Sequence, residues 1–399
     1  MPKTLLAVAL TALLALPGTA ACSTPAAQAT PAPSPGVTAT DLTARLDGAV
    51  QQVMRELAIP GAIVAVSVPG VVDYTGAFGV GDKATGTPMS LDDHMRIGSV
   101  TKTFTGTAIL QLVEQGRIAL TDPIAKYVDG VPSGDDITLR MLGDMHSGLY
   151  SFEQDPEFVT TVLNELPKGP DAGAVTPRQL IEITARHPLN FAPGSRFQYA
   201  NINLVLLGMV VEKVTGQPLA EYFQQHIFDP LRLTQTSCPS SGELPVPYAH
   251  GYTTTPDGRE VDASLWNPVW AGAAGAMVST VADLKTWALA LAKGTLLAPQ
   301  VQRERLEQVD RTGLGALYRF AIFDLNGWWG HNGSIPGYTT VMVAIPERNA
   351  SLVVLANTDI PDQHAAGRIA QVVTQLVTPD NVYHLVSPAP PPTPMPSGR

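Results

Sequence analysis

Ser99 and Lys102 stand three residues apart in RIGSVTKTF (96–104), at the start of a stretch with a helical pattern. Residues three apart on a helix share one face, with Cβ atoms about 5–6 Å apart, so the lysine amine could reach the serine hydroxyl. A serine hydroxyl needs an adjacent base to act as a nucleophile at neutral pH, and a helix N-terminus favours negative charge there. The same pattern also fits a serine that caps a helix and a solvated lysine one turn later. The pair alone does not decide between these interpretations.

Two further polar groups lie downstream. Tyr199 and Asn201 form the only Tyr-x-Asn in the chain, just before an apolar helical run, where a short loop could direct both side chains into a cleft. The alternative is a core tyrosine beside a helix-capping asparagine. His331 and Gly333 lie in a predicted strand beside another strand, where glycine lets a substrate backbone approach closely. The alternative for His331 is an ordinary turn histidine.

In this order, the three elements resemble the motifs of the serine-reactive β-lactamases and penicillin-binding proteins. Those proteins use Ser-x-x-Lys, then Ser- or Tyr-x-Asn, then Lys-Thr-Gly on a strand. The chain resembles in particular the branch with class C β-lactamases, D-alanyl-D-alanine carboxypeptidases and related esterases. The resemblance runs from roughly Leu46 to Thr358 and includes RIGSVTKTFTGTAILQLVEQGRIALTDPIAKYV, FAPGSRFQYANINLVLLGMVVEKVTGQPLAEYFQQHIFDPL and GHNGSIPGY.

The resemblance implies that Ser99 forms an acyl-enzyme and that Lys102 and Tyr199 are its proton-transfer partners. Lysine and tyrosine have ordinary pKa values of about 10.4 and about 10, so the site must shift them for either to act as a base. Which of the two is the general base stays open, because a coupled pair titrates as a unit. The resemblance further implies that Asn201 hydrogen-bonds Lys102 and the substrate amide. It places the backbone N–H groups of Ser99 and Ser334 in an oxyanion hole, and it implies no cofactor and no metal.

The chain departs from the β-lactamase pattern at His331, where most β-lactamases of this group carry lysine. A lysine is a permanent cation for a substrate carboxylate, whereas a histidine with a pKa near 6.5 is mostly neutral at pH 7.4. Carboxypeptidases and esterases of the branch often have histidine there, so we expect weak β-lactam hydrolysis at most. Trp270 either lines the cleft or belongs to the core.

Other catalytic patterns fit less well. His146-Ser147-Gly148 also reads His-x-Gly, but it precedes Tyr199 and has helical and turn signals around it, which indicates a structural loop. No Gly-x-Ser-x-Gly occurs, which leaves an α/β-hydrolase elbow unsupported. No His-Glu-x-x-His or paired-cysteine set indicates zinc.

The elements that must position these residues predict an α+β fold. A helical pattern at 42–57 precedes two strand patterns, 62–68 and 71–80, and a mainly helical stretch runs from about 99 to 235. Strand patterns then return in WWGHNG, YTTVMVAIP and ASLVVLANT, before a last helix from about Gln363 to Val377. Strands from both ends of the chain should therefore share one antiparallel sheet flanked by helices. The inserted helical lobe then forms a cleft against that sheet, in the β-lactamase/transpeptidase-like arrangement.

The composition is that of a globular enzyme or small-molecule binder. The chain has 399 residues, 45% of them hydrophobic and 15% charged, and a net charge of −10. No basic run offsets this charge, which argues against nucleic acid or an anionic membrane surface as a partner.

The first residues, MPKTLLAVALTALLALPGTAAC, predict an export signal (1–21). Lys3 precedes an apolar run of 12 residues, Leu5 to Leu16, which is too short to span about 30 Å of hydrocarbon. The small residues before Cys22 resemble a lipoprotein cleavage site, although Thr19 departs from the usual larger aliphatic residue. A soluble secreted product is therefore the alternative. If Cys22 is not lipidated, Cys238, the other cysteine, is its one candidate disulfide partner.

The predicted organisation has four parts: a signal peptide (1–21), a lipidated Cys22 with a linker (22–40), a hydrolase domain (41–385) and a Pro-rich tail (386–399). We expect an outer-face, membrane-anchored lipoprotein that contacts the membrane through its lipid only. Its substrate would be a peptidoglycan stem peptide, an ester or a β-lactam. The alternative function is a non-hydrolytic penicillin- or peptidoglycan-binding lipoprotein. The physiological substrate and the oligomeric state stay open.

Overall fold

The computed structural model describes residues 39–160, 168–172, 174–255, 257–307, 310–311, 315–360 and 364–385. The predicted signal peptide, Cys22 and the Pro-rich tail lie outside the described residues. Within the described part of the chain, no helix is long and apolar enough to cross a membrane.

Strands from both ends of the chain form one antiparallel sheet, as predicted. Within the described residues it has nine strands in the order β3-β2-β1-β13-β12-β11-β10-β9-β8. Ala62 near the N-terminal end pairs with Ala356 near the C-terminal end. The strands are β1 (Gly61–Val68), β2 (Val72–Asp82), β3 (Thr87–Pro88), β8 (Asp310–Arg311), β9 (Leu317–Arg319), β10 (Ile322–Leu325), β11 (Trp328–Ile335), β12 (Tyr338–Ile345) and β13 (Ala350–Ala356).

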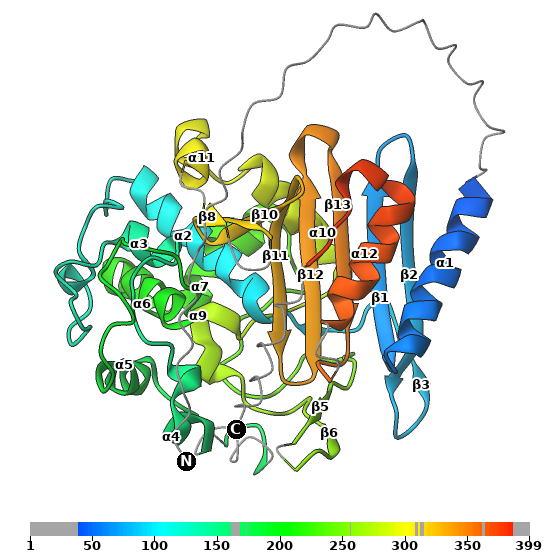
Figure 1. Cartoon of the computed structure of the whole chain (residues 1–399), viewed down its shortest axis with the longest axis horizontal. Coiled ribbons are helices and arrows are strands. Elements are labelled where there is room, and N and C mark those ends of the chain that lie inside the picture. The colour runs from blue at the N-terminus through cyan, green and yellow to red at the C-terminus, as the bar shows by residue number, and fades with distance from the viewer. Residues whose placement is uncertain are drawn as a thin grey trace, which may run out of the picture. The chain divides into compact units, whose positions relative to one another are not determined.

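Helices cover both faces of this sheet. Every residue of β12 and β13 is buried, which is why their sequences are continuous apolar runs rather than alternating patterns. Helix α12 (Ala365–Val377) packs on these two strands beside α1 (Ala39–Glu56), and α10 (Val281–Lys293) packs on them from the other face (Figure 1).

The inserted lobe is mainly helical, also as predicted, so the α+β class is confirmed. Its first long helix, α2 (Thr101–Glu114), is buried along most of its length and packs against α6 (Ile202–Thr215) and α9 (Gly272–Gly275). Phe104 of α2 stacks on Trp287 of α10 with ring centroids 4.2 Å apart, which fixes the lobe against the sheet. The start of α2 therefore lies at the junction of lobe and sheet.

The other helical elements and two small sheets complete the described fold. The helices and helical turns of the lobe are η1 (Gly98–Val100), α2 (Thr101–Glu114), η2 (Ile124–Lys126), α3 (Leu139–Gly143), η3 (Phe152–Gln154), α4 (Pro156–Phe158), α5 (Pro177–Ala185), α6 (Ile202–Thr215), α7 (Leu219–Phe223), η6 (Gln224–Phe228) and α8 (Asp229–Leu231). Later helical elements are η7 (Val269–Ala271), α9 (Gly272–Gly275), α11 (Pro299–Leu306), η8 (Pro346–Arg348) and η9 (Pro379–Asn381). Two small sheets pair β4 (Met95–Arg96) with β7 (Val278–Ser279) and β5 (Tyr252–Thr254) with β6 (Glu260–Asp262).

Candidate active site

Two glycines bring strand β11 into direct contact with the chain around Ser99. Gly98 has φ +50°, and a Cβ placed on it would lie 2.9 Å from the backbone nitrogen of Ser334. A Cβ on Gly333 would lie 2.1 Å from the carbonyl oxygen of Ile97 and 3.1 Å from the backbone nitrogen of Ser99. Neither position has room for a side chain. The backbone around Gly98 therefore contacts the backbone around Gly333, and this contact brings the amide nitrogens of Ser99 and Ser334 to the same site.

The hydroxyl of Ser99 is the meeting point of two polar side chains. Lys102 Nζ donates a hydrogen bond to Ser99 Oγ at 2.8 Å, and Tyr199 OH donates another at 2.9 Å. Ser99 lies in the short 3-10 turn η1 that precedes α2, and its side chain makes no capping hydrogen bond. The helix-cap interpretation of Ser99 is therefore wrong.

Burial shifts the pKa values of the two partners in opposite directions. Lys102 is fully buried and also donates to the carbonyl oxygen of Ala274 at 2.7 Å. Desolvation lowers the pKa of Lys102 to about 7, against a smaller opposing effect of the Glu153 charge. Part of the Tyr199 side chain is exposed in the cleft, but protein atoms surround the rest of it. Desolvation by these atoms raises the pKa of Tyr199 above the ordinary tyrosine value. Near neutral pH a large fraction of Lys102 is thus uncharged, while Tyr199 keeps its proton.

Asn201 has a different partner from the one predicted. Its Nδ2 donates a hydrogen bond to Glu153, whose other carboxylate oxygen accepts from Ser151. The predicted Asn201–Lys102 hydrogen bond is wrong. Lys102 donates to Ser99 and to the Ala274 carbonyl, and Asn201 Oδ1, the atom that would accept from Lys102, has no hydrogen-bond partner among the described residues. The sequence analysis missed Glu153; its only signal was an acidic residue in YSFEQDPEF, soon after His146-Ser147-Gly148.

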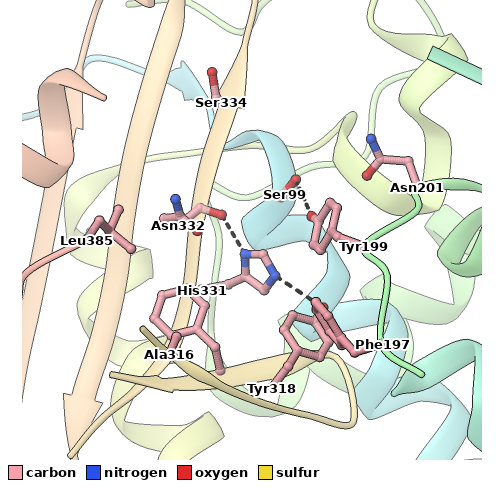
Figure 2. Close-up of a pocket in the computed structure, with 11 residues that line it drawn as sticks. Ser99, Phe197, Tyr199, Asn201, Ala316, Tyr318, His331, Asn332, Ser334 and Leu385 are labelled. Atoms are coloured by element: carbon pink, nitrogen blue, oxygen red, sulfur yellow. Dashed lines mark hydrogen bonds between the residues drawn. The ribbon is translucent and has the colours of Figure 1, made fainter. Parts of the chain in front are cut away.

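His331 lies on β11 as a buried, neutral ring. Its Nδ1 lies 2.6 Å from the carbonyl oxygen of Asn332 and must donate to it, so Nε2 is the acceptor that faces the Tyr318 hydroxyl at 3.3 Å (Figure 2). Burial, and secondarily the charge of Lys102, lowers the pKa of His331 to about 3. The histidine therefore supplies no positive charge to the site near neutral pH.

These side chains surround a pocket of about 500 Å³ (Figure 2). Among the described residues, no lysine or arginine lines it. The lining residues are Ser99, Phe197, Tyr199, Asn201, Ala316, Tyr318, Phe323, His331, Asn332, Ser334 and Leu385. Five predicted site residues therefore meet at this pocket: Ser99, Tyr199, Asn201, His331 and Ser334. The sequence analysis missed the apolar wall of the pocket, which Phe197, Tyr318, Phe323 and Leu385 form.

Trp270, which the sequence left open, and the His146-Ser147-Gly148 loop both lie outside this pocket wall. Trp270 packs edge-on against Phe152 and Phe158, with ring centroids 6.4 and 5.8 Å away, and is not among the lining residues. Ser147 is buried and donates a hydrogen bond to Asn203. The His146-Ser147-Gly148 loop is therefore structural, as expected.

Comparison with known proteins identifies the family. A family model described as "Beta-lactamase" matches residues 46–375, so the chain belongs to the beta-lactamase family. Proteins similar to the chain include a D-stereospecific amidohydrolase and an esterase, and the chain is a serine hydrolase of this family.

Three relatives show the range of similarity. A solved D-stereospecific amidohydrolase from Streptomyces sp. superposes with a TM-score of 0.73 at 31% identity and covers 84% of this chain and 99% of its own. Esterase EstB from Burkholderia gladioli is 33% identical over 222 residues, which is 53% of this chain and 56% of the esterase. Protein flp from Staphylococcus aureus is 25% identical over 350 residues, 84% of this chain but only 66% of that longer protein.

Proposed function

We propose that this protein cleaves amide or ester bonds through an acyl-enzyme on Ser99. The observation that carries the proposal is the pair of hydrogen bonds from Lys102 and Tyr199 to Ser99 Oγ at the pocket. As Ser99 Oγ bonds to the substrate carbonyl carbon, its proton passes to uncharged Lys102. That proton is then available for the departing nitrogen or oxygen, through Tyr199. In the second half of the reaction, water loses a proton to Lys102 and attacks the acyl carbon. The bond to Ser99 Oγ then breaks, Ser99 regains a proton, and the acid is released.

Two backbone amides would stabilise the charge that develops on the carbonyl oxygen. The N–H groups of Ser99 and Ser334 belong to segments that Gly98 and Gly333 hold in contact. An oxyanion-hole donor contributes about 10²–10³ in rate, because it is already oriented before the reaction. The close contact between η1 and β11 supports this role.

The pocket favours uncharged or cationic substrates over carboxylate-bearing ones. Phe197, Tyr318, Phe323 and Leu385 form an apolar wall, and His331 is neutral. A substrate carboxylate would find no permanent cation among the described residues that line the pocket. The similarity to a D-stereospecific amidohydrolase and to an esterase supports esters and amides as the substrate class, with β-lactams weak substrates at best.

Turnover of small activated esters and amino-acid amides by the purified protein tests this proposal. Repeated turnover, with a transient acyl group on Ser99 in the mass spectrum, is the expected result. A fluorescent penicillin that labels Ser99 and stays bound for hours, without turnover of any ester or amide, would support the penicillin-binding alternative instead.

The pH dependence of the reaction should report Lys102. Protonated Lys102 cannot accept the Ser99 proton, so kcat/KM for an uncharged ester should rise with pH through about 7, the pKa of this lysine. His331, with a pKa of about 3, should add no inflection at pH 6–7. The measurement is kcat/KM between about pH 5 and about pH 9, corrected for spontaneous ester hydrolysis. A profile that is flat over this range would contradict Lys102 as the proton acceptor.

We also propose that the protein is exported and anchored to the outer face of the membrane by lipid on Cys22. The apolar run Leu5–Leu16 and the small residues before Cys22 support this location. Labelled fatty acid should be incorporated into the protein in a bacterial host. The Cys22→Ala variant should leave the membrane fraction, because it lacks the residue that would carry the two or more acyl chains needed for stable anchoring. Cys238→Ala is the matched control and should stay in the membrane fraction. Membrane association that survives Cys22→Ala would point to an uncleaved signal.

A further inference from the structure

One side of the pocket is formed by the C-terminal end of the described chain. Leu385, the last described residue, lines the pocket together with residues of the sheet and of the helical lobe. Figure 2 shows Leu385 and Tyr199 on opposite sides of the His331 ring. A substrate group that extends from Ser99 along the apolar wall therefore runs toward Leu385.

Two hydrogen bonds and one buried ring hold this end of the chain in place. Trp328 Nε1 of β11 donates a hydrogen bond to the carbonyl oxygen of Asn381 at 2.6 Å. The backbone N–H of Tyr383 donates to Thr374 Oγ1 of α12 at 2.9 Å, and the Tyr383 side chain is fully buried. Leu385 follows Tyr383 by two residues, so a packed segment positions its side chain at the pocket.

Leu385 is packed differently from Tyr318 and Phe323, the two wall residues of the sheet. Both aromatic rings are buried in the core, so a change in their size would disturb the core itself. Leu385 is only partly buried against that core. Helix α12 backs it, because a Cβ placed on Gly367 would lie 3.3 Å from Leu385 Cδ1. The size of the side chain at position 385 therefore controls the space in the pocket with little effect on the core.

We propose that Leu385 sets the size limit for the apolar group that the pocket accepts from an ester or amide substrate. The wall of Phe197, Tyr318 and Phe323 favours an alkyl or aryl group, because contact with this wall removes apolar area from water. A longer group gains from the wall until it meets Leu385. This role of Leu385 rests on the proposed hydrolysis at Ser99 and adds the substrate preference.

Two series of esters measure this limit. One series varies the acyl chain of p-nitrophenyl esters from acetate to octanoate, and the other varies the alcohol of acetate esters from methyl to octyl. In the series whose chain enters the pocket, kcat/KM should rise by up to about 4-fold for each CH₂ buried and fall once the chain meets Leu385. The series that responds identifies the bound group as the acyl part or the departing part, and the other series is the internal control.

Leu385→Ala should move the maximum of this series to a longer chain, and Leu385→Phe should move it to a shorter one. The ratio of kcat/KM for the longest and the shortest ester should change by about 10-fold or more, in opposite directions in the two variants. One extra or missing methylene in an apolar pocket already changes kcat/KM by about 10- to 200-fold. A ratio within one variant does not depend on the amount of folded protein, and general damage to the fold does not produce opposite shifts.

His384→Ala is the matched control, because His384 is exposed, precedes Leu385 and is not among the lining residues; it should keep the wild-type profile. A maximum that stays at the same chain length in both Leu385 variants would overturn the proposal. So would a wild-type protein that hydrolyses all esters of both series equally well. If the wild-type protein hydrolyses no activated ester at all, the proposed function fails first, and this inference with it.

Discussion

Ser99→Ala should abolish acyl transfer and leave the fold intact. The substitution removes the atom to which both Lys102 and Tyr199 donate, and no other hydroxyl among the described residues receives both. Loss of a catalytic serine typically costs about 10⁴–10⁶ in kcat. The free energy of unfolding should change by about 1 kcal/mol or less, because Ser99 caps no helix and Lys102 keeps the Ala274 carbonyl. Ester hydrolysis, intact-protein mass after exposure to an activated ester, and thermal unfolding measure these effects.

Ser147→Ala is the matched control for this experiment. Ser147 is a buried serine that hydrogen-bonds Asn203 in the structural loop, so its loss should lower stability by about 1–3 kcal/mol. The folded variant should still be acylated at Ser99. Acylation that persists in Ser99→Ala would show that another residue is the nucleophile and would refute the assignment.

The residues around Ser99 were predictable where their geometry is local. Ser99 and Lys102 meet because one helical turn separates them, and the Tyr199 motif joins them because its order in the chain matches a known family. The shared sheet was predictable for a similar reason, since short runs rich in apolar and β-branched residues, such as β12 and β13, favour buried strands. The 3-10 turn that contains Ser99 was not predictable, because it depends on the contact between Gly98 and β11.

The partners of the motif residues were not predictable, because tertiary contacts between distant loops set them. Glu153 precedes Asn201 by 48 residues, and only the packing of η3 beside the start of α6 brings them together. The carbonyl of Ala274, which holds Lys102, carries no side-chain signal at all. The apolar wall likewise combines Phe197, Tyr318 and Leu385 from separate parts of the chain.

His331 shows how a correct expectation can rest on an incomplete reason. Its ordinary pKa near 6.5 already predicts a mostly neutral ring at pH 7.4. In the structure the neutrality is far stronger, because the ring is buried and sits between the Asn332 carbonyl and the Tyr318 hydroxyl. The histidine is therefore part of the pocket wall and no switchable cation.

Gly333→Ala should lower kcat by about 10²–10³ with a smaller change in KM, because it acts on the proposed oxyanion hole. The added Cβ would lie 2.1 Å from the Ile97 carbonyl oxygen and 3.1 Å from the Ser99 nitrogen, and both are backbone atoms that cannot rotate away. Strand β11 must then move from η1 and carry the Ser334 amide with it. The overpacking should also cost about 1–3 kcal/mol of stability. Steady-state kinetics on an activated ester, well below the unfolding temperature, measure the catalytic part.

Gly61→Ala separates this effect from general damage to the sheet. Gly61 lies in β1 of the same sheet, away from Ser99, and its added Cβ would lie 2.4 Å from the backbone oxygen of Val80. It should therefore lose comparable stability and keep kcat, whereas Gly333→Ala should lose both. The two variants together decide whether the contact between Gly333 and η1 serves the reaction. If Gly333→Ala loses stability but keeps the wild-type kcat, the Ser334 amide does not act in the transition state, and the oxyanion hole must use another donor.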